Sequence, residues 1–328
     1  MQDIVQIKEL LEMDVPIPRY TSYPTAPVWG PLEVTSYKEA LLHVQDGLSL
    51  YIHIPFCKSM CLYCGCSVIL NRKKENEDIY VEYLLKEIAL LAKTLGRKKI
   101  LQLHFGGGTP TKLSEEHFDQ IMEALRSHFS FPEEAELAIE IDPRTVDEDD
   151  GKKLSHLKRL GFTRVSFGVQ DTDENVQKAV KRYQSYDVTK KTFLKARHLG
   201  FDGINIDLIY GLPYQTTKTF QKTIDDILAL SPDRIALFSY AKVPWLKPHQ
   251  KAIKEELLPT SDEKFQIYVL ARKAFIEKGY QAIGMDHFAK AHDTLSLARK
   301  EKTLSRNFQG YTVLDVQDLV GLGITSIG

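Results

Sequence analysis

The chain has 328 residues, of which 43% are apolar and 27% are charged, and its 43 basic side chains nearly balance its 44 acidic ones. This composition is that of a folded globular protein and excludes a largely disordered chain. A net charge of −1 gives no general attraction to nucleic acid or anionic membranes, and the sequence lacks a long apolar run or a signal-peptide layout. We therefore expect a cytoplasmic protein that binds neither nucleic acid nor membrane.

The first 47 residues differ from the rest of the chain. Residues 1–14 have the apolar spacing of a short amphipathic helix, and residues 16–31 contain five prolines. Because proline fixes φ and restricts the residue before it, the second segment is expected to be an extended arm. The arm either packs against the surface or acts as a lid that brings aromatic side chains and Arg19 to a site.

Short β-rich runs alternate with amphipathic helical patterns from residue 48 onward, without a composition break that would mark a linker. We therefore expect residues 48–328 to form one domain, preceded by the N-terminal segment 1–47. Apolar, β-branched and aromatic runs bounded by turn residues predict six strands: Leu48–Ile54, Ile100–Phe105, Leu137–Ile141, Arg164–Val169, Ile204–Tyr210 and Ile235–Tyr240.

Repeated strand–helix units predict an α/β fold with a parallel sheet and right-handed crossovers. The sheet is either open and doubly wound or curled, and we favour a partial (β/α)6 barrel of the TIM type. A last long helix is expected to begin after Thr260, which forms a capping box with Glu263, and to end near Lys278. In both architectures ligands bind at the carboxyl ends of the strands, so the loops that follow the strands are the candidate site.

All four cysteines lie in one such loop, directly after the first predicted strand. Thiols crowded this closely in a reducing compartment are metal ligands or redox groups rather than structural bridges. Thiolates at Cys57, Cys61 and Cys64 can bind three irons of a [4Fe-4S] cluster, which leaves the fourth iron for an external ligand such as S-adenosylmethionine (SAM). The alternative is a structural zinc held by all four sulfurs, for which the single residue between Cys64 and Cys66 is unfavourable.

A glycine-rich loop, Gly106-Gly107-Gly108-Thr109, follows the second predicted strand. Glycines allow the backbone to approach a ligand closely. A nucleoside triphosphate loop is disfavoured because no Gly-Lys-Ser/Thr sequence follows, whereas a simple tight turn remains an alternative.

Polar side chains also occur where parallel strands are normally apolar. Asp207 lies within the fifth predicted strand, Glu140 near the end of the third, and Gln170 just after the fourth. A buried carboxylate is costly unless it is paired or hydrogen-bonded. These residues therefore either close a core network or share a pocket at the carboxyl ends of the strands.

The spacing C-x3-C-x2-C, with an aromatic residue before the last cysteine, resembles the radical SAM superfamily. Further motifs resemble one of its families, the oxygen-independent coproporphyrinogen III oxidases. These motifs lie at distant places, and the resemblance covers essentially the whole chain. They are Pro18–Thr25, Tyr51–Cys57, the extra Cys66, Gly284–Phe288 and Arg306–Tyr311.

This resemblance implies a set of site residues. The [4Fe-4S] cluster would be bound by Cys57, Cys61 and Cys64. Contacts to one SAM molecule would come from Tyr51, Gly107 and Glu140. Contacts to a second SAM molecule would come from Tyr63, Gly108, Thr109, Gln170, Arg182, Asp207, Ala241 and Ile327. The candidate catalytic residues are Cys66, as a thiol that is not a cluster ligand, and Arg19 and Arg306, whose guanidinium groups can bind substrate carboxylates.

The resemblance also implies the reaction, in which two propionate side chains of coproporphyrinogen III are oxidatively decarboxylated to vinyl groups, giving protoporphyrinogen IX for heme synthesis. The expected partners are this substrate, an electron donor for the cluster and a terminal electron acceptor, and the protein is expected to be a monomer. The family continues into a helical carboxyl-terminal domain, and Leu319–Gly328 has the pattern of a buried element, so we expect a truncated chain.

Three rival functions stay open at this point. A heme-degrading methyltransferase shares the cysteine loop. A heme chaperone of the same fold usually lacks a cysteine at the place of Cys66 and lacks the segment Arg306–Tyr311. The third rival is a zinc-stabilised binding protein.

Overall fold

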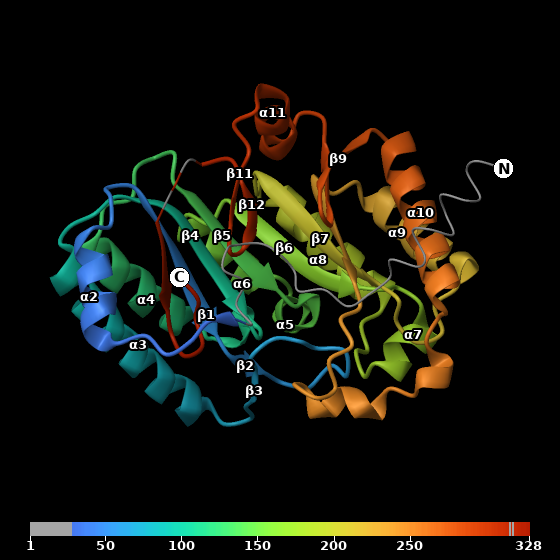
Figure 1. Ribbon diagram of the computed structural model, residues 1–328, viewed down its shortest axis with the longest axis horizontal. Helices are drawn as coiled ribbons and strands as arrows, with labels where there is room; N and C mark the ends of the chain where they lie inside the picture. Colours follow the sequence, from blue (N-terminus) through green and yellow to red (C-terminus); the bar gives the residue numbers. More distant parts are fainter. Residues whose placement is uncertain (1–27, 315, 317) are drawn as a thin grey trace.

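The computed structural model describes residues 28–314, 316 and 318–328 (Figure 1). A nine-stranded sheet with the order β13-β1-β4-β5-β6-β7-β8-β10-β9 forms its centre. The six predicted strands are all present: β1 (Leu48–Ile54), β4 (Ile100–Gly107), β5 (Glu136–Ile141), β6 (Arg164–Gln170), β7 (Gly203–Tyr210) and β8 (Arg234–Ser239). They pair in parallel in chain order, which confirms the predicted α/β partial barrel.

The sequence did not predict the strands at the two edges of this sheet. β13 (Leu319–Leu322) pairs in parallel with β1, while β10 (His287–Lys290) pairs antiparallel with both β8 and β9 (Tyr280–Gly284). Two smaller pairs lie outside the main sheet: β2 (Phe56–Cys57) with β3 (Ile69–Leu70), and β11 (Ser305–Asn307) with β12 (Gly310–Thr312). The strands of these two smaller pairs have only two or three residues each, too few to show a period of two in the sequence.

Helices surround the outside of the curved sheet (Figure 1). They are α2 (Val34–Leu42), α3 (Lys74–Leu95), α4 (Glu115–His128), α5 (Pro143–Asp147), α6 (Lys152–Arg159), α7 (Glu174–Ala179), α8 (Tyr186–His198), α9 (Thr217–Leu230), α10 (Ser261–Glu277) and α11 (Thr294–Glu301). The helix predicted after Thr260 is α10, and its capping box is present, since Thr260 and Glu263 each accept a hydrogen bond from the other's backbone N–H. Within the described residues, none of the helices combines the length and the hydropathy of a transmembrane span.

Strand alternation gives the sheet an apolar outer face and a polar inner face. Successive side chains of a strand point to opposite faces. In β5 and β6, Ile139 and Phe167 are buried in the main core together with helix residues such as Phe118. The inner face instead carries side chains such as Glu140 and Ser166, which are register neighbours and line a cavity. The fold therefore places polar side chains in a cavity at the carboxyl ends of its strands.

Candidate functional site

The cysteine loop lies at the carboxyl end of β1, as expected, and is fastened there by short strands. The N–H of Ile69 donates to the carbonyl of Pro55 at 2.7 Å, and the N–H of Asn71 donates to the carbonyl of Cys57 at 3.1 Å. All four cysteines line one cavity of about 1110 Å³. Cys61 is buried, while Cys66 is exposed.

Each of the three expected ligand cysteines has a polar neighbour suited to a thiolate. The Cys57 Sγ lies 3.4 Å from the hydroxyl of Thr109, and the Cys61 Sγ lies 3.6 Å from Nη1 of Arg182. A hydrogen bond from the Cys66 thiol lowers the pKa of Cys64. Burial acts in the opposite direction on Cys57 and raises its pKa to about 11.

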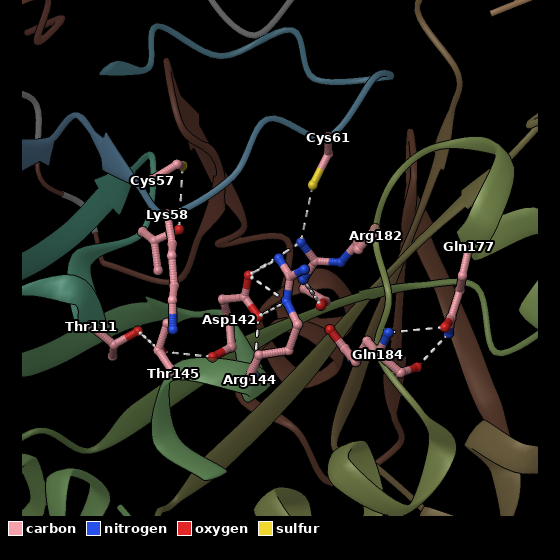
Figure 2. Close-up of polar contacts among 12 residues, drawn as sticks. Cys57, Lys58, Cys61, Thr111, Asp142, Arg144, Thr145, Gln177, Arg182 and Gln184 are labelled. Atoms are coloured by element: carbon pink, nitrogen blue, oxygen red, sulfur yellow. Dashed lines mark hydrogen bonds and ion pairs between the residues drawn. The ribbon is translucent and has the colours of Figure 1, made fainter. Parts of the chain in front are cut away.

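A buried ion cluster lies beside Cys61 (Figure 2). Asp142, the N-cap of α5, accepts hydrogen bonds from Nε and Nη2 of Arg144 at 2.9 and 2.5 Å. Nη1 of Arg182 lies 3.4 Å from the same carboxylate. Burial alone would raise the pKa of Asp142, but the charge of Arg182 and the hydrogen bonds of Arg144 lower it to about 2. The carboxylate is therefore ionised, and the cluster as a whole carries positive charge next to the cysteine loop.

A second group of polar residues lies between β1, β4 and β5. The Glu140 carboxylate accepts a hydrogen bond from the N–H of Gly107 at 3.1 Å and lies 3.4 Å from Nε2 of His104. The ring of His104 stacks on Tyr51, whose hydroxyl lies 3.0 Å from Nδ1 of His53. The structure thus brings together Tyr51, Gly107 and Glu140, the three residues expected at one SAM molecule.

The next part of the cavity wall, beside β5, comes from β6 and β7. Asp207 accepts hydrogen bonds from Ser166 at 3.1 Å and from Asn205 at 2.7 Å, so its carboxylate has the partners that the sequence required. Gln170 has a positive φ of 72°, and its buried amide oxygen has no hydrogen-bond partner among the described residues. The buried hydroxyl of Tyr240 likewise has no hydrogen-bond partner among the described residues. Unpartnered buried polar atoms on a cavity wall are the groups that a polar ligand would satisfy.

The remaining expected residues divide into those at the cavity and those away from it. The cavity is also lined by Tyr63, Gly108, Thr109, Ala241 and Ile327. Arg306 is exposed and does not line the cavity, because its Nη1 points to the sulfur of Met285 at 3.5 Å. Its neighbours in the hairpin do line it: Asn307, Phe308, Gln309 and Tyr311. Arg19 and most of the N-terminal arm lie outside the described residues.

Sequence reasoning missed His53, Asp142 and Arg144. The signal for Asp142 was present, since Asp-Pro is a helix start with an N-cap followed by proline at the first helical position. The signal for His53 was also present, because it lies two residues after Tyr51 in the first predicted strand and alternate side chains of a strand share a face. Only the sheet register brings its ring against Gly107, where a Cβ atom would lie 2.5 Å from the histidine.

The donor set at this loop fits an iron–sulfur cluster. It consists of three cysteines with a guanidinium and hydroxyl group beside their sulfurs, and hydrogen bonds to sulfur stabilise the thiolates that ligate iron. Within the described part of the chain, no three His, Cys, Asp or Glu side chains are placed to hold a single metal ion. The ligands of a cubane cluster bind separate irons and do not have to converge on one ion.

Comparisons with known proteins agree with this geometry. The family model of the radical SAM superfamily matches residues 51–227. The oxygen-independent coproporphyrinogen III oxidase of Bradyrhizobium diazoefficiens is 43% identical over 95% of this chain and 70% of its own length. The enzyme of that name from Helicobacter pylori is 42% identical over 99% of this chain and 72% of its own length.

A solved structure extends the similarity to the whole described fold. Coproporphyrinogen III oxidase from Escherichia coli, described as a radical SAM enzyme, superimposes with a TM-score of 0.90 at 40% sequence identity. The match covers 99% of this chain and 72% of that one.

Proposed function

This chain belongs to the oxygen-independent coproporphyrinogen III oxidases, a family of the radical SAM superfamily, and we propose that it decarboxylates coproporphyrinogen III. In the proposed reaction two propionate side chains become vinyl groups and the product is protoporphyrinogen IX, an intermediate of heme synthesis. The observation that supports this most is the cysteine loop beside a large cavity, with Tyr51, Gly107 and Glu140 gathered on one wall.

The proposed ligands of a [4Fe-4S] cluster are Cys57, Cys61 and Cys64. With SAM bound, such a cluster supplies one-electron cleavage of the sulfonium and thereby a carbon radical that abstracts hydrogen. Glu140 and the backbone of Gly107 lie where they can bind the charged methionine end of one SAM molecule, since the carboxylate offers an acceptor for an ammonium group. Glu140 already accepts the N–H of Gly107, so its position is fixed before the ligand binds.

A second SAM molecule is proposed on the wall formed by β6, β7 and the loop after β8. Gln170, Arg182, Asp207 and Ala241 line this part of the cavity. The unpartnered amide oxygen of Gln170 and the unpartnered Nε of Arg182 support it, because both are buried polar atoms that a ligand would satisfy. The Asp207 carboxylate on the same wall accepts a hydrogen bond from Ser166.

Each propionate must lose one hydrogen atom from the carbon next to the ring, one electron and carbon dioxide to become a vinyl group. The hydrogen goes to the carbon radical and the electron to an external acceptor, so the proposal requires an electron donor and an acceptor as partners. Arginines near the cavity are candidates to bind the propionates that do not react. Arg306 belongs to the hairpin that lines the cavity, although its own side chain points to Met285.

Product analysis tests this function. The protein is reconstituted with iron and sulfide without oxygen and incubated with coproporphyrinogen III, SAM and a low-potential reductant. The proposal predicts products that have lost one and then two carboxyl groups, as measured by mass spectrometry. Heme binding without any decarboxylated product would contradict the proposal and support the chaperone alternative.

A further inference from the structure

Two arginines share the carboxylate of Asp142, and only one of them reaches a cysteine. Arg144 binds Asp142 through two nitrogens, whereas Arg182 contacts both Asp142 and the sulfur of Cys61 (Figure 2). Arg182 is buried, with 6% of its surface exposed. A buried charge beside a sulfur is screened little by solvent, so its effect on that sulfur is strong.

The guanidinium of Arg182 is fixed in place from several sides. Its second terminal nitrogen, Nη2, donates to the carbonyl of Gly168. Its own backbone N–H donates to the carbonyl of Gln177 at 2.9 Å. The Gln177 side chain in turn accepts the N–H of Gln184 at 3.0 Å, which closes the loop that carries Arg182 (Figure 2).

This loop is also attached directly to the cysteine loop. The N–H of Leu62, next to Cys61, donates to the carbonyl of Val180 at 2.9 Å. Leu62 and Val180 also pack in one small hydrophobic cluster with Tyr240. The two loops therefore cannot move apart without breaking both a backbone hydrogen bond and an apolar contact.

Hydrogen bonds to the sulfurs and the local net charge are two of the main determinants of the reduction potential of an iron–sulfur cluster. A cation beside a ligand sulfur stabilises the reduced form, which carries one more negative charge. We propose that Arg182 donates a hydrogen bond to the Cys61 thiolate and raises the reduction potential of the bound cluster, with Asp142 positioning Arg182. This inference rests on the proposed function, because it requires a cluster at Cys57, Cys61 and Cys64.

The role does not compete with the SAM contact proposed for the same side chain. Nη1 faces Cys61 and Asp142, and Nη2 faces Gly168, whereas Nε has no hydrogen-bond partner among the described residues. One guanidinium can therefore serve the sulfur and a ligand through different nitrogens.

The test is a redox titration of the reconstituted cluster in the absence of SAM and substrate. Electron paramagnetic resonance measures the reduced cluster at each potential. Arg182→Gln is expected to shift the midpoint potential to more negative values. Arg144→Gln is the matched control, since it removes the same charge from the same carboxylate but no contact to sulfur, and its shift is expected to be smaller. Arg182→Lys keeps the charge and loses the planar fork, so its potential is expected between those of wild type and Arg182→Gln.

The positioning role of Asp142 is tested by a double-mutant cycle. Asp142→Asn removes a negative charge, which by itself raises the potential, and it also releases Arg182, which lowers it. In the Arg182→Gln background only the first effect remains. The shift caused by Asp142→Asn is therefore expected to be more negative when Arg182 is present than when it has been replaced.

Iron and sulfide analysis distinguishes a failure of the proposed function from a failure of the inference about Arg182. Failure of the wild-type protein to take up iron and sulfide would contradict the proposed function and overturn the inference with it. A fully loaded Arg182→Gln protein with an unchanged or higher potential would overturn the inference alone. Equal shifts in Arg182→Gln and Arg144→Gln would also overturn it. They would show that the loss of a positive charge changes the potential and that the contact with the Cys61 sulfur does not. If Arg182→Gln does not fold, Arg182→Lys is compared with the wild type: a more negative potential is expected, and an unchanged or higher potential would overturn the inference.

Discussion

The hydroxyl of Tyr51 lies 3.0 Å from Nδ1 of His53. The other ring nitrogen of His53 lies 3.0 Å from the carbonyl oxygen of Ser67, which can only accept a hydrogen bond. Nε2 therefore carries the proton and Nδ1 accepts from the phenol. Burial lowers the pKa of His53, which favours this neutral form. The histidine thus fixes the orientation of Tyr51 at the proposed SAM site.

We predict that His53→Leu weakens SAM binding roughly two- to tenfold, which corresponds to the loss of one ordinary hydrogen bond. Equilibrium dialysis of SAM against the reconstituted protein measures the effect. Tyr51→Phe removes the same hydrogen bond from the other side, so the double variant is expected to lose less than the product of the two single effects. Fully multiplicative losses would show that the two side chains act independently.

A substitution at Gly107 tests the close approach of the glycine loop to the same histidine. Gly107 has a φ of 111°, and a Cβ there would lie 2.5 Å from the His53 ring. Both strain and overlap oppose a side chain, so Gly107→Ala is expected to lower the free energy of unfolding by about 1–3 kcal/mol. Urea denaturation measures this change.

Gly65→Ala is the control for that experiment. A Cβ at Gly65, in the cysteine loop, would meet no atom within 4 Å. Its effect on the free energy of unfolding is therefore expected to stay within about 0.5 kcal/mol. Similar losses in both variants would mean that the contact with His53 is not the cause.

The four cysteines are predicted to differ in their importance for the cluster. Cys61→Ser should lose most of the bound iron and sulfide, because it removes one of the three proposed ligands. Cys66→Ser should retain them, since Cys66 is exposed and lies outside the C-x3-C-x2-C spacing. Iron and sulfide content per chain after anaerobic reconstitution measures both. An equal loss in the two variants would count Cys66 among the ligands.

The strand pattern was readable from the sequence because the central strands bury runs of apolar side chains against helices. The runs that predicted β1, β5 and β7 are the runs whose side chains fill the core. The same reasoning explains why β13 was missed, since its four residues include a glycine and its pairing partner β1 lies far away in the chain.

The site was predictable to the extent that single positions carry a chemical signal. Asp207 stood out as a carboxylate in an apolar strand, and the structure gives it partners on neighbouring inner-face positions. The contact between Arg182 and Cys61 could not be foreseen, because the two residues are 121 positions apart and meet only through the sheet topology. Arg306 was expected at the cavity, but its side chain is exposed and points to Met285.

The pH dependence of stability is predicted to depend on Asp171, which follows Gln170 and is buried in a network with Gln215 and Thr223. Burial raises the pKa of Asp171 to about 6, against an ordinary value near 3.9 in an unfolded chain. Between these values the folded protein holds a proton that the unfolded chain has lost. The contribution of Asp171 to the free energy of unfolding therefore falls by up to about 3 kcal/mol as the pH rises from about 4 to about 6.

Asp171→Asn removes this titration and serves as the comparison. The free energy of unfolding of the wild type, minus that of the variant, is expected to decrease as the pH is raised from 4.5 to 7. Urea denaturation at several pH values measures this difference. A difference that does not change with pH would show that the Asp171 carboxyl titrates normally in the folded protein.

We propose that this chain removes a hydrogen atom from the substrate propionates by radical SAM chemistry. The most direct measurement uses coproporphyrinogen III deuterated at the propionate carbons next to the ring, incubated with the reconstituted protein, SAM and reductant. Mass spectrometry of the 5′-deoxyadenosine formed is predicted to show deuterium, together with vinyl products. Vinyl products accompanied by undeuterated 5′-deoxyadenosine, or no cleavage of SAM at all, would contradict the account.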